Sequence, residues 1–207
     1  MSRKEFIVKC ASELFLKKGY DRTSIRDVAA ASGISMATLY HYISTKENLL
    51  KLVVEYHNSS NNKIIDQIER AIKSSDPESA LLDAIRILLT GIDGHKERFV
   101  FVFAEAKLMP KHIRSVILET EAKIISVFKR IIVDGKKRKI FNFNNPELIA
   151  HHIVSMIEMW GVKWWYLKQH ATLDEFNQSL NNFILSSLHG ADCQFTDYSV
   201  QQKKRKI

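Results

Sequence analysis

Hydrophobic residues recur at spacings of three and four along most of the chain, which is the period of an amphipathic α-helix. The first such segment runs up to Gly19, a residue suited to ending a helix. Longer helices are expected over about 45–73, 77–92, 96–108, 113–134, 147–168 and 173–188. The run from Arg98 to Phe103 would also suit a strand, but the chain offers no second strand to pair with it. The pattern predicts an all-α fold of about nine helices.

Two short helices are expected between residue 19 and the first long helix. Ser24 opens a capping-box pattern for one of them, and Ser35 can cap the other. Gly33 lies between them, where the chain must turn sharply with a positive φ. Ser44 and Glu47 repeat the capping-box spacing at the start of the next helix. This order predicts a helix-turn-helix, a motif whose second helix enters the major groove of DNA.

Composition and charge agree with a helical protein that has a polyanionic partner. Only 7 glycines and 3 prolines in 207 residues leave few places to break a helix. The formal net charge of +8 suits DNA, although charge alone is equally compatible with an ordinary basic protein. No apolar run approaches the roughly 18 residues that a membrane span needs. No signal-peptide pattern or metal-ligand spacing of cysteines is evident either, so we expect a cytoplasmic protein without a cofactor or membrane partner.

The residues around the helix-turn-helix also resemble the N-terminal domain of the TetR/AcrR transcriptional regulators, from Arg3 to about Val53. Ile43 departs from the family pattern, which commonly has phenylalanine there, but it is still apolar. The matching residues are Ala11, Phe15, Gly19-Tyr20, Thr23-Ser24-Ile25, Asp27-Val28-Ala29, Ala31, Gly33-Ile34-Ser35, Thr38-Leu39-Tyr40, Tyr42, Lys46-Glu47 and Leu49-Leu50.

The resemblance implies a ligand-responsive DNA-binding regulator. In most cases such a protein is a repressor that binds a palindromic operator as a homodimer and is released by a small effector. The chain is accordingly divided into a DNA-binding head (1–48), a helical body for effector binding and dimerisation (49–190) and a basic tail (191–207), which is expected to be disordered. The polar stretch 58–62 would lie where head and body join.

DNA-contacting residues are expected on the two short helices and just after them. The resemblance implies that Tyr40 and His41 hold phosphates and that Ala37 and Thr38 face base edges. The methyl group of either of the last two can touch a thymine methyl, and Arg26 can reach a phosphate or a base. The full predicted set adds phosphate contacts from Ser24 and Lys46, the cap Ser35 and an apolar contact from Met36 to Arg26, Ala37, Thr38, Tyr40 and His41.

The body is expected to provide a dimer interface and an effector cavity. Its last two helices carry more apolar surface than one core easily buries, which favours an interface made by Ile157, Phe176, Leu180, Phe183, Ile184 and Leu188. Aromatic residues suit a cavity for a small apolar effector, such as an acyl-CoA or a lipid-like compound, although at helical spacing they are more often ordinary core. The expected lining is Phe101, Glu105, Met109, His112, Phe128, His152, Trp160 and Trp164.

Several alternatives stay open. A helical protein-interaction module, or a constitutive DNA binder without an effector, fits the same pattern. An enzyme is not expected, because the chain has no glycine-rich phosphate loop, nucleophile elbow or paired cysteine ligands. A metal site from Glu147, His151, His152 and Glu158 is disfavoured, since adjacent histidines face different sides of a helix. The basic run 136–139 is either a solvated helix end or a second DNA contact.

Overall fold

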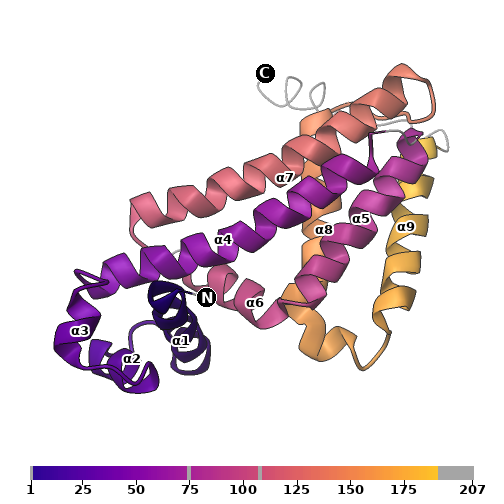
Figure 1. Ribbon diagram of the computed structural model, residues 1–207. Coiled ribbons are helices and arrows are strands. Elements are labelled where there is room, and N and C mark those ends of the chain that lie inside the picture. Colours follow the sequence, from indigo (N-terminus) through magenta and orange to yellow (C-terminus); the bar gives the residue numbers. More distant parts are fainter. Residues whose placement is uncertain (1, 74–75, 107–108, 191–207) are drawn as a thin grey trace, which may run out of the picture.

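The computed structural model describes residues 2–73, 76–106 and 109–190, and in this part of the chain it contains nine α-helices and no strand. Helices α1 (Arg3–Lys18), α2 (Ile25–Ala31) and α3 (Met36–Tyr40) form the head, and α4 (Lys46–Ala71) leads from it into the body (Figure 1). The body continues with α5 (Pro77–Asp93), α6 (Lys96–Glu105), α7 (Lys111–Lys137), α8 (Pro146–Leu167) and α9 (Leu173–His189). The all-α prediction is confirmed. The tail 191–207 lies outside the described residues.

Local hydrogen bonds fix the helix-turn-helix as the sequence predicts. Ser24 and Asp27 form a complete capping box, in which the Asp27 N–H donates to the Ser24 Oγ at 3.1 Å and the Ser24 N–H donates to the Asp27 carboxylate at 2.8 Å. The Ser35 Oγ accepts from the Thr38 N–H at 3.1 Å and so begins α3. Gly33 has a φ of +63°, a conformation that favours glycine. The turn between α2 and α3 is therefore determined by residues that are close together in the sequence.

Two predicted helix boundaries are wrong. Helix α4 is capped by Thr45, whose Oγ1 accepts from the Asn48 N–H at 3.0 Å, and not by Ser44 with Glu47. The Thr45 backbone is extended, with a φ of −145° and a ψ of 166°, as is usual for an N-cap residue. Helix α7 passes through Gly135 and ends at Lys137. Gly135 is needed for close packing instead, because a Cβ there would overlap the ring of Phe141.

Two hydrophobic clusters hold the molecule together, and they do not follow the boundary between head and body. One cluster lies among the helices of the body and includes the fully buried Phe128. The other fills the head around Phe15, but it also contains Phe101 of α6 and Met109 and Ile113 at the start of α7. The Phe15 and Phe101 rings stack with their centroids 6.3 Å apart. Side chains from α6 and from the start of α7 are thus part of the head's core.

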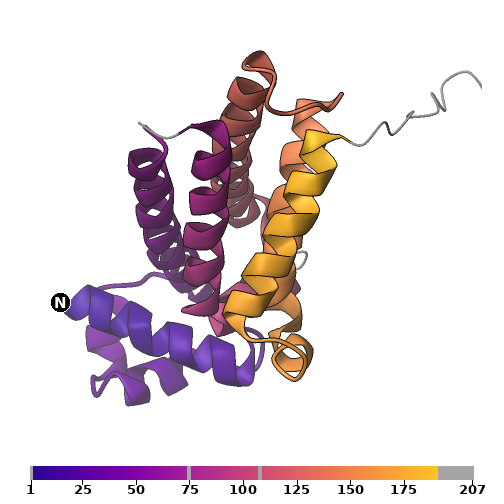
Figure 2. The same ribbon diagram turned by 90° about the vertical axis from the view of Figure 1, so that its right-hand side faces the viewer.

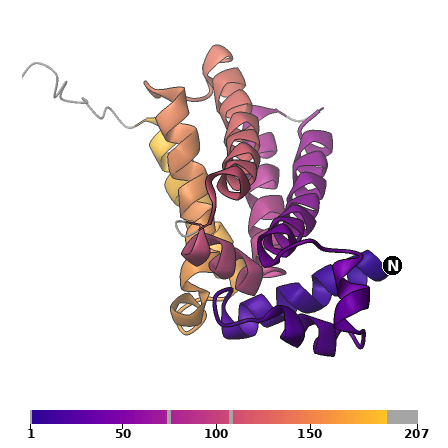
Figure 3. The same cartoon turned by 90° about the vertical axis from the view of Figure 1, so that its left-hand side faces the viewer.

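The head lies across one end of the body helices (Figures 2 and 3). Helix α4 joins the two, and its polar stretch 58–62 is continuous helix. Two polar contacts support this joint. Ser12 Oγ of α1 lies 3.0 Å from His57 Nε2 of α4, and the side-chain amide of Asn58 donates to the Val116 carbonyl of α7 at 3.2 Å. Head and body therefore meet in a packed contact that also contains hydrogen bonds. None of the described helices is long and apolar enough to cross a membrane.

Candidate nucleic-acid interface

Helix α3 and the residue after it present a short surface of small and aromatic side chains to solvent. Leu39 is fully buried and anchors the helix, whereas Ala37, Tyr40 and His41 are exposed, with Tyr40 at 53%. Met36 is half-buried and packs against the head cluster, so only part of it is available for an apolar contact with DNA. The exposed side of α3 therefore brings together several of the residues expected to face DNA.

The hydroxyl groups at this surface are largely occupied by one another. Ser35 Oγ and Thr38 Oγ1 lie 2.9 Å apart, in addition to the capping bond between Ser35 and the backbone of Thr38. The Ser24 hydroxyl donates to the Asp27 carboxylate at 2.8 Å and accepts from its N–H. Hydrogen bonds from the backbone and side chain of Ser24 hold the pKa of the Asp27 carboxyl below its usual range. These hydroxyl groups fix the backbone of the motif.

Two cations were predicted to reach DNA, and the structure places them differently. Arg26 is exposed on α2, without a hydrogen bond or ion pair to any described residue. Lys46 is held by the segment before α2: its Nζ donates to the Asp21 carbonyl at 3.1 Å and lies 4.4 Å from the Tyr20 ring centroid. Burial, followed by the carboxylates of Glu47 and Asp21, raises the pKa of Tyr20. Lys46 thus joins the start of α4 to the head.

The residues predicted to line one effector cavity lie in different surroundings. Phe101 and Met109 belong to the head cluster, whereas Phe128 and Trp160 belong to the body cluster. His112 is exposed and lies 3.4 Å from Glu47. Of the other three, His152 is exposed, and Glu105 and Trp164 are half-buried. These eight side chains thus lie in different surroundings among the described residues, and an effector cavity lined by them stays a prediction.

Trp160 takes part in a polar network at the junction of α5, α6 and α8. Its indole N–H donates to Asp93 Oδ1 at 2.9 Å, and Lys96 Nζ donates to the same oxygen at 3.0 Å. Burial of Asp93 opposes ionisation, but these two hydrogen bonds outweigh it and lower the pKa of the carboxyl. Lys96 and Lys168 also lie 5.3 and 4.2 Å from the Trp164 ring centroid. The network holds the start of α6 against α8.

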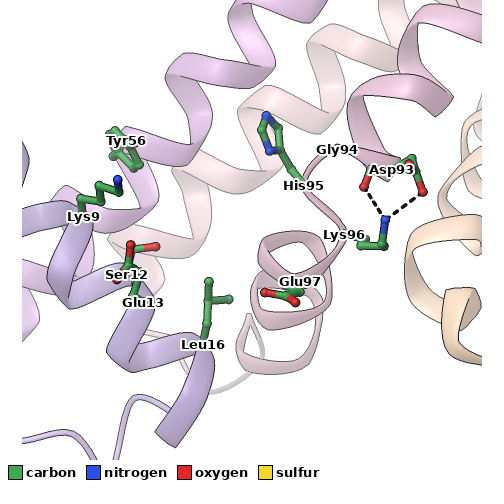
Figure 4. Close-up of a pocket in the computed structure, with 10 residues that line it drawn as sticks. All are labelled: Lys9, Ser12, Glu13, Leu16, Tyr56, Asp93, Gly94, His95, Lys96 and Glu97. Carbon is green, nitrogen blue, oxygen red and sulfur yellow. Dashed lines mark hydrogen bonds and ion pairs between the residues drawn. The ribbon is translucent and has the colours of Figure 1, made fainter.

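A surface groove of about 450 Å³ adjoins this network and separates part of the head from the body (Figure 4). Helix α1 contributes Lys9, Ser12, Glu13 and Leu16, α4 contributes Tyr56, and the turn from α5 to α6 contributes residues 93–97. Sequence reasoning missed this groove because its walls come from segments that only tertiary packing brings together. It contains none of the residues predicted to bind an effector.

The predicted dimer residues are also divided by the structure. Ile157, Leu180, Ile184 and Leu188 are buried in the protomer's own core, and Phe176 packs on Trp160 with ring centroids 5.1 Å apart. The four buried side chains are therefore covered within the protomer and Phe176 is half-buried, and a dimer interface on these helices stays a prediction.

Phe183 on α9 is the sixth predicted dimer residue and is 61% exposed. Leu148 and Trp165 on α8 are also large exposed hydrophobic residues. The apolar side chains available to a partner on the last two helices are thus fewer than the sequence suggested, and Phe183 is the predicted one among them.

The alternative metal site finds no support in the described residues, which contain no group of three or more His, Cys, Asp and Glu side chains that could hold a metal ion. Glu147 instead pairs with Lys129 at 2.6 Å, and that hydrogen bond lowers its pKa. Glu158 is half-buried, and burial together with the Glu121 carboxylate raises its pKa to about 7. The basic run 136–139 lies at the end of the body far from the head (Figure 1).

A helix-turn-helix head built onto a helical body defines a DNA-binding transcription regulator. Residues 7–53 match the family model described as bacterial regulatory proteins of the TetR family, and residues 74–188 match the tetracyclin repressor-like C-terminal domain. Because the second match alone spans more than half of the chain, the protein belongs to the TetR family of transcriptional regulators.

Known proteins of this family resemble the chain at low sequence identity. The probable HTH-type transcriptional regulator YttP of Bacillus subtilis (strain 168) is 24% identical over 139 residues, which are 67% of this chain and 67% of that protein. A TetR-family regulatory protein from Rhodococcus RHA1 has a TM-score of 0.80 at 20% identity, covering 93% of this chain and 100% of that one. Bacillus subtilis FadR in complex with stearoyl-CoA has a TM-score of 0.73 at 19% identity, covering 89% and 99%. At these identities the structures show a shared fold.

Proposed function

We propose that this protein is a repressor that binds a palindromic operator as a homodimer and leaves it when a small effector binds to the body. The observation that carries the proposal is the exposed surface of α3 and the adjoining α2, with Leu39 and the capped turn holding α3 in place. In a helix-turn-helix the second helix lies in the major groove, and a two-fold dimer places two such helices on two half-sites.

The DNA-binding part of the proposal assigns base contacts to Arg26, Ala37 and Thr38 and phosphate contacts to Tyr40 and His41. Ser24 and Ser35 act mainly by holding the backbone, since their hydroxyl groups are hydrogen-bonded within the head. Lys46 donates one of its three ammonium hydrogens to the Asp21 carbonyl, and we assign the remaining donors to a phosphate. Met36 adds the part of its side chain that the head cluster leaves exposed.

Selection of bound sequences from random DNA duplexes tests this assignment directly. A palindromic consensus is expected, and Arg26→Ala should weaken its binding more than Glu13→Ala, a control on the exposed side of α1. Lys46→Ala should weaken binding to all sequences alike. It should also lower the slope of log binding constant against log salt concentration by about one, because one phosphate contact is lost. A helical interaction module without DNA binding predicts that no sequence is enriched.

The effector part of the proposal rests on the aromatic side chains of the body helices. It also rests on the resemblance in fold to FadR, whose structure holds stearoyl-CoA. A small apolar compound would bind among the body helices and favour a spacing of the two heads that no longer matches the operator. Such a compound must bind the two states with different affinity, since equal affinity shifts nothing.

Trp160 and Trp164 lie on the body side of the α6 junction and provide the assay. Titration with a panel of acyl-CoAs and hydrophobic drugs should change tryptophan fluorescence and, for the active compound, lower the affinity for the selected operator. Trp165→Phe serves as a control that removes an exposed indole and keeps the other two. If no compound changes either signal, the protein is a constitutive DNA binder.

A further inference from the structure

We infer that the groove between head and body is a second regulatory site, which binds a free α-amino acid. The groove is the one formed by α1, by Tyr56 of α4 and by residues 93–97 at the turn from α5 to α6. This inference goes beyond the proposed function, because the site lies outside the body core and its ligand is a zwitterion, whereas the proposed effector is apolar. The effect on DNA binding rests on the proposed function, but binding of the amino acid does not.

The groove has room for a small molecule, and its walls come from both parts of the protein. Its volume of about 450 Å³ lies within the range of about 300–1,000 Å³ that is usual for small-molecule sites. Helix α1 of the head forms one side, and the turn with the first residues of α6 forms the other (Figure 4). A compound that fills the groove would therefore contact head and body at once.

Three of the polar side chains that line the groove are engaged with the protein itself. The Ser12 hydroxyl lies 3.0 Å from His57 Nε2, and Lys96 donates to Asp93 Oδ1 at 3.0 Å. Asp93 Oδ1 also accepts the indole N–H of Trp160 at 2.9 Å. These contacts hold the walls in place and connect the groove to Trp160, so tryptophan fluorescence should report a bound compound.

The other charged side chains of the groove have no partner among the described residues. Lys9 and Glu13 are exposed on α1, and Glu97 is exposed on α6. None of these three side chains forms a hydrogen bond or an ion pair with a described residue. Lys9 and Glu97 carry opposite charges on opposite sides of the groove (Figure 4). The groove therefore suits a ligand that carries both charges.

An amino acid matches these groups. Its carboxylate would pair with Lys9 and its ammonium with Glu97, so that the ligand bridges α1 and α6. A compound with positive charge alone would leave Lys9 unpaired. One with negative charge alone would leave Glu97 unpaired and would face Glu13, which lies one helical turn from Lys9. The half-buried Leu16 and the ring of Tyr56, which is 36% exposed, provide apolar surface for the side chain of the ligand.

A ligand that bridges the two walls couples its own binding to the position of the head. It would stabilise the head position described here, in which Lys9 and Glu97 line one groove, against any tilt that operator binding requires. Two ligands that favour different states lower each other's affinity by the same factor, which is commonly about fivefold or more. The amino acid should therefore lower the affinity for the operator.

Isothermal titration calorimetry of the full-length chain tests the site, with tryptophan fluorescence as a second signal. The probes are the proteinogenic L-amino acids, each added alone. At least one should bind with a Kd of about 0.1–1 mM, since contacts made by exposed side chains are of moderate strength. The N-acetyl derivative of that amino acid lacks the ammonium, and its amide derivative lacks the carboxylate. Each should bind about tenfold more weakly, because one charge-assisted hydrogen bond is lost.

Matched variants assign each end of the ligand to one wall. Lys9→Met keeps the aliphatic stem and removes the charge, so it should weaken the amino acid about tenfold and leave the affinity for the amide derivative unchanged. Glu97→Gln should in the same way weaken the amino acid and not the N-acetyl derivative. Lys17→Met removes an exposed cation of α1 that is not among the residues lining the groove, and it should bind the amino acid like wild type. Circular dichroism of each variant reports whether the helices are intact.

The effect on DNA is measured at an amino-acid concentration that saturates wild type but not Lys9→Met. Affinity for the selected operator should fall about fivefold or more for wild type and stay nearly constant for Lys9→Met.

The results that would overturn the inference are distinguishable from a failure of the proposed function. If no amino acid binds, or if Lys9→Met and Glu97→Gln bind it like wild type, the groove is not the site, while the proposed function stands. If the two derivatives bind as tightly as the amino acid, the ligand is not recognised as a zwitterion. If the amino acid binds in the groove and operator affinity does not fall, the regulatory role is wrong. If selection enriches no operator, the proposed function fails and the regulatory role with it, but calorimetry still decides whether the groove binds an amino acid.

Discussion

Replacing Glu158 by glutamine should stabilise the protein at alkaline pH and have little effect at acidic pH. Glu158 lies half-buried on α8, and its burial, together with the Glu121 carboxylate, raises its pKa from 4.5 to about 7. Between these two values the folded protein holds a proton that the unfolded chain has lost. Stability therefore falls as the pH rises from about 4.5 through about 7, because ionisation is costlier in the folded state.

The size of the effect follows from the two pKa values. A difference of about 2.5 corresponds to at most about 3.4 kcal/mol above pH 7, at about 1.36 kcal/mol for each pH unit. Glu158 retains some exposure and the site can relax, so we expect a gain of about 1–2 kcal/mol for Glu158→Gln near pH 8. Near pH 5 the wild-type side chain is mostly protonated in the folded state, and the two proteins should differ by only a few tenths of a kcal/mol.

Urea unfolding of wild type and variant at the two pH values measures this difference. The protomer concentration must be equal throughout, because dimerisation would make stability concentration-dependent. All other ionisable groups are present in both proteins, so their contributions cancel in the difference. Glu119→Gln removes an exposed carboxylate from α7 and should show no such dependence on pH. A gain that is the same at both pH values would refute the assignment to Glu158.

The other predictions concern packing, the turn and the interface. Phe101→Ala should lower the free energy of unfolding by about 3–4 kcal/mol, measured by urea unfolding, because the ring is buried against Phe15. Gly33→Ala should lower it by about 1 kcal/mol, since φ is +63° and no atom would clash with the new Cβ; Gly94→Ala, without a positive φ, is the control. Phe183→Asp should yield monomers in sedimentation, whereas Phe103→Asp, on an equally exposed ring of α6, should not; a dimeric Phe183→Asp would place the interface elsewhere.

The helix-turn-helix could be predicted closely because its geometry is encoded by adjacent residues. Ser24, Gly33 and Ser35 act within three or four positions of themselves, so the caps and the turn are visible in the sequence. The same local reasoning failed at Gly135, where a glycine is needed because a Cβ would overlap the ring of Phe141. A glycine that permits close packing and a glycine that ends a helix look alike in a single sequence.

The effector lining could not be predicted because helical aromatic residues do not reveal which core they join. Phe101 lies two residues from both Phe99 and Phe103 and does not share their helix face, whereas Phe99 and Phe103 are four residues apart and lie on the same face. Phe99 packs against the body cluster, Phe101 belongs to the head cluster, and Phe103 is 58% exposed. The position of α6 between the two hydrophobic clusters determines which of these three rings is buried and in which cluster. That position depends on contacts between residues far apart in the sequence.

The apolar residues of α9 that are covered within the protomer could not be identified from the sequence for a related reason. The apolar face of α9 suggested more surface than one protomer could cover, but Leu180, Ile184 and Leu188 fit into the body cluster. Hydrophobic periodicity predicts that a face is buried, without naming the partner. Among the predicted dimer residues, Phe183 is the one whose side chain is exposed and available to a second subunit.

The mixed composition of the head cluster limits how freely this head can be exchanged with another. Phe101, Met109 and Ile113 come from the body but complete the core beneath α1 and α4. A chimera joined within α4 that takes a foreign head would have to match these three side chains as well as the junction itself. Conversely, a body expressed without residues 1–48 would expose them to water as a new apolar patch. We therefore expect a transplanted head to keep its stability only if these three side chains are supplied with it.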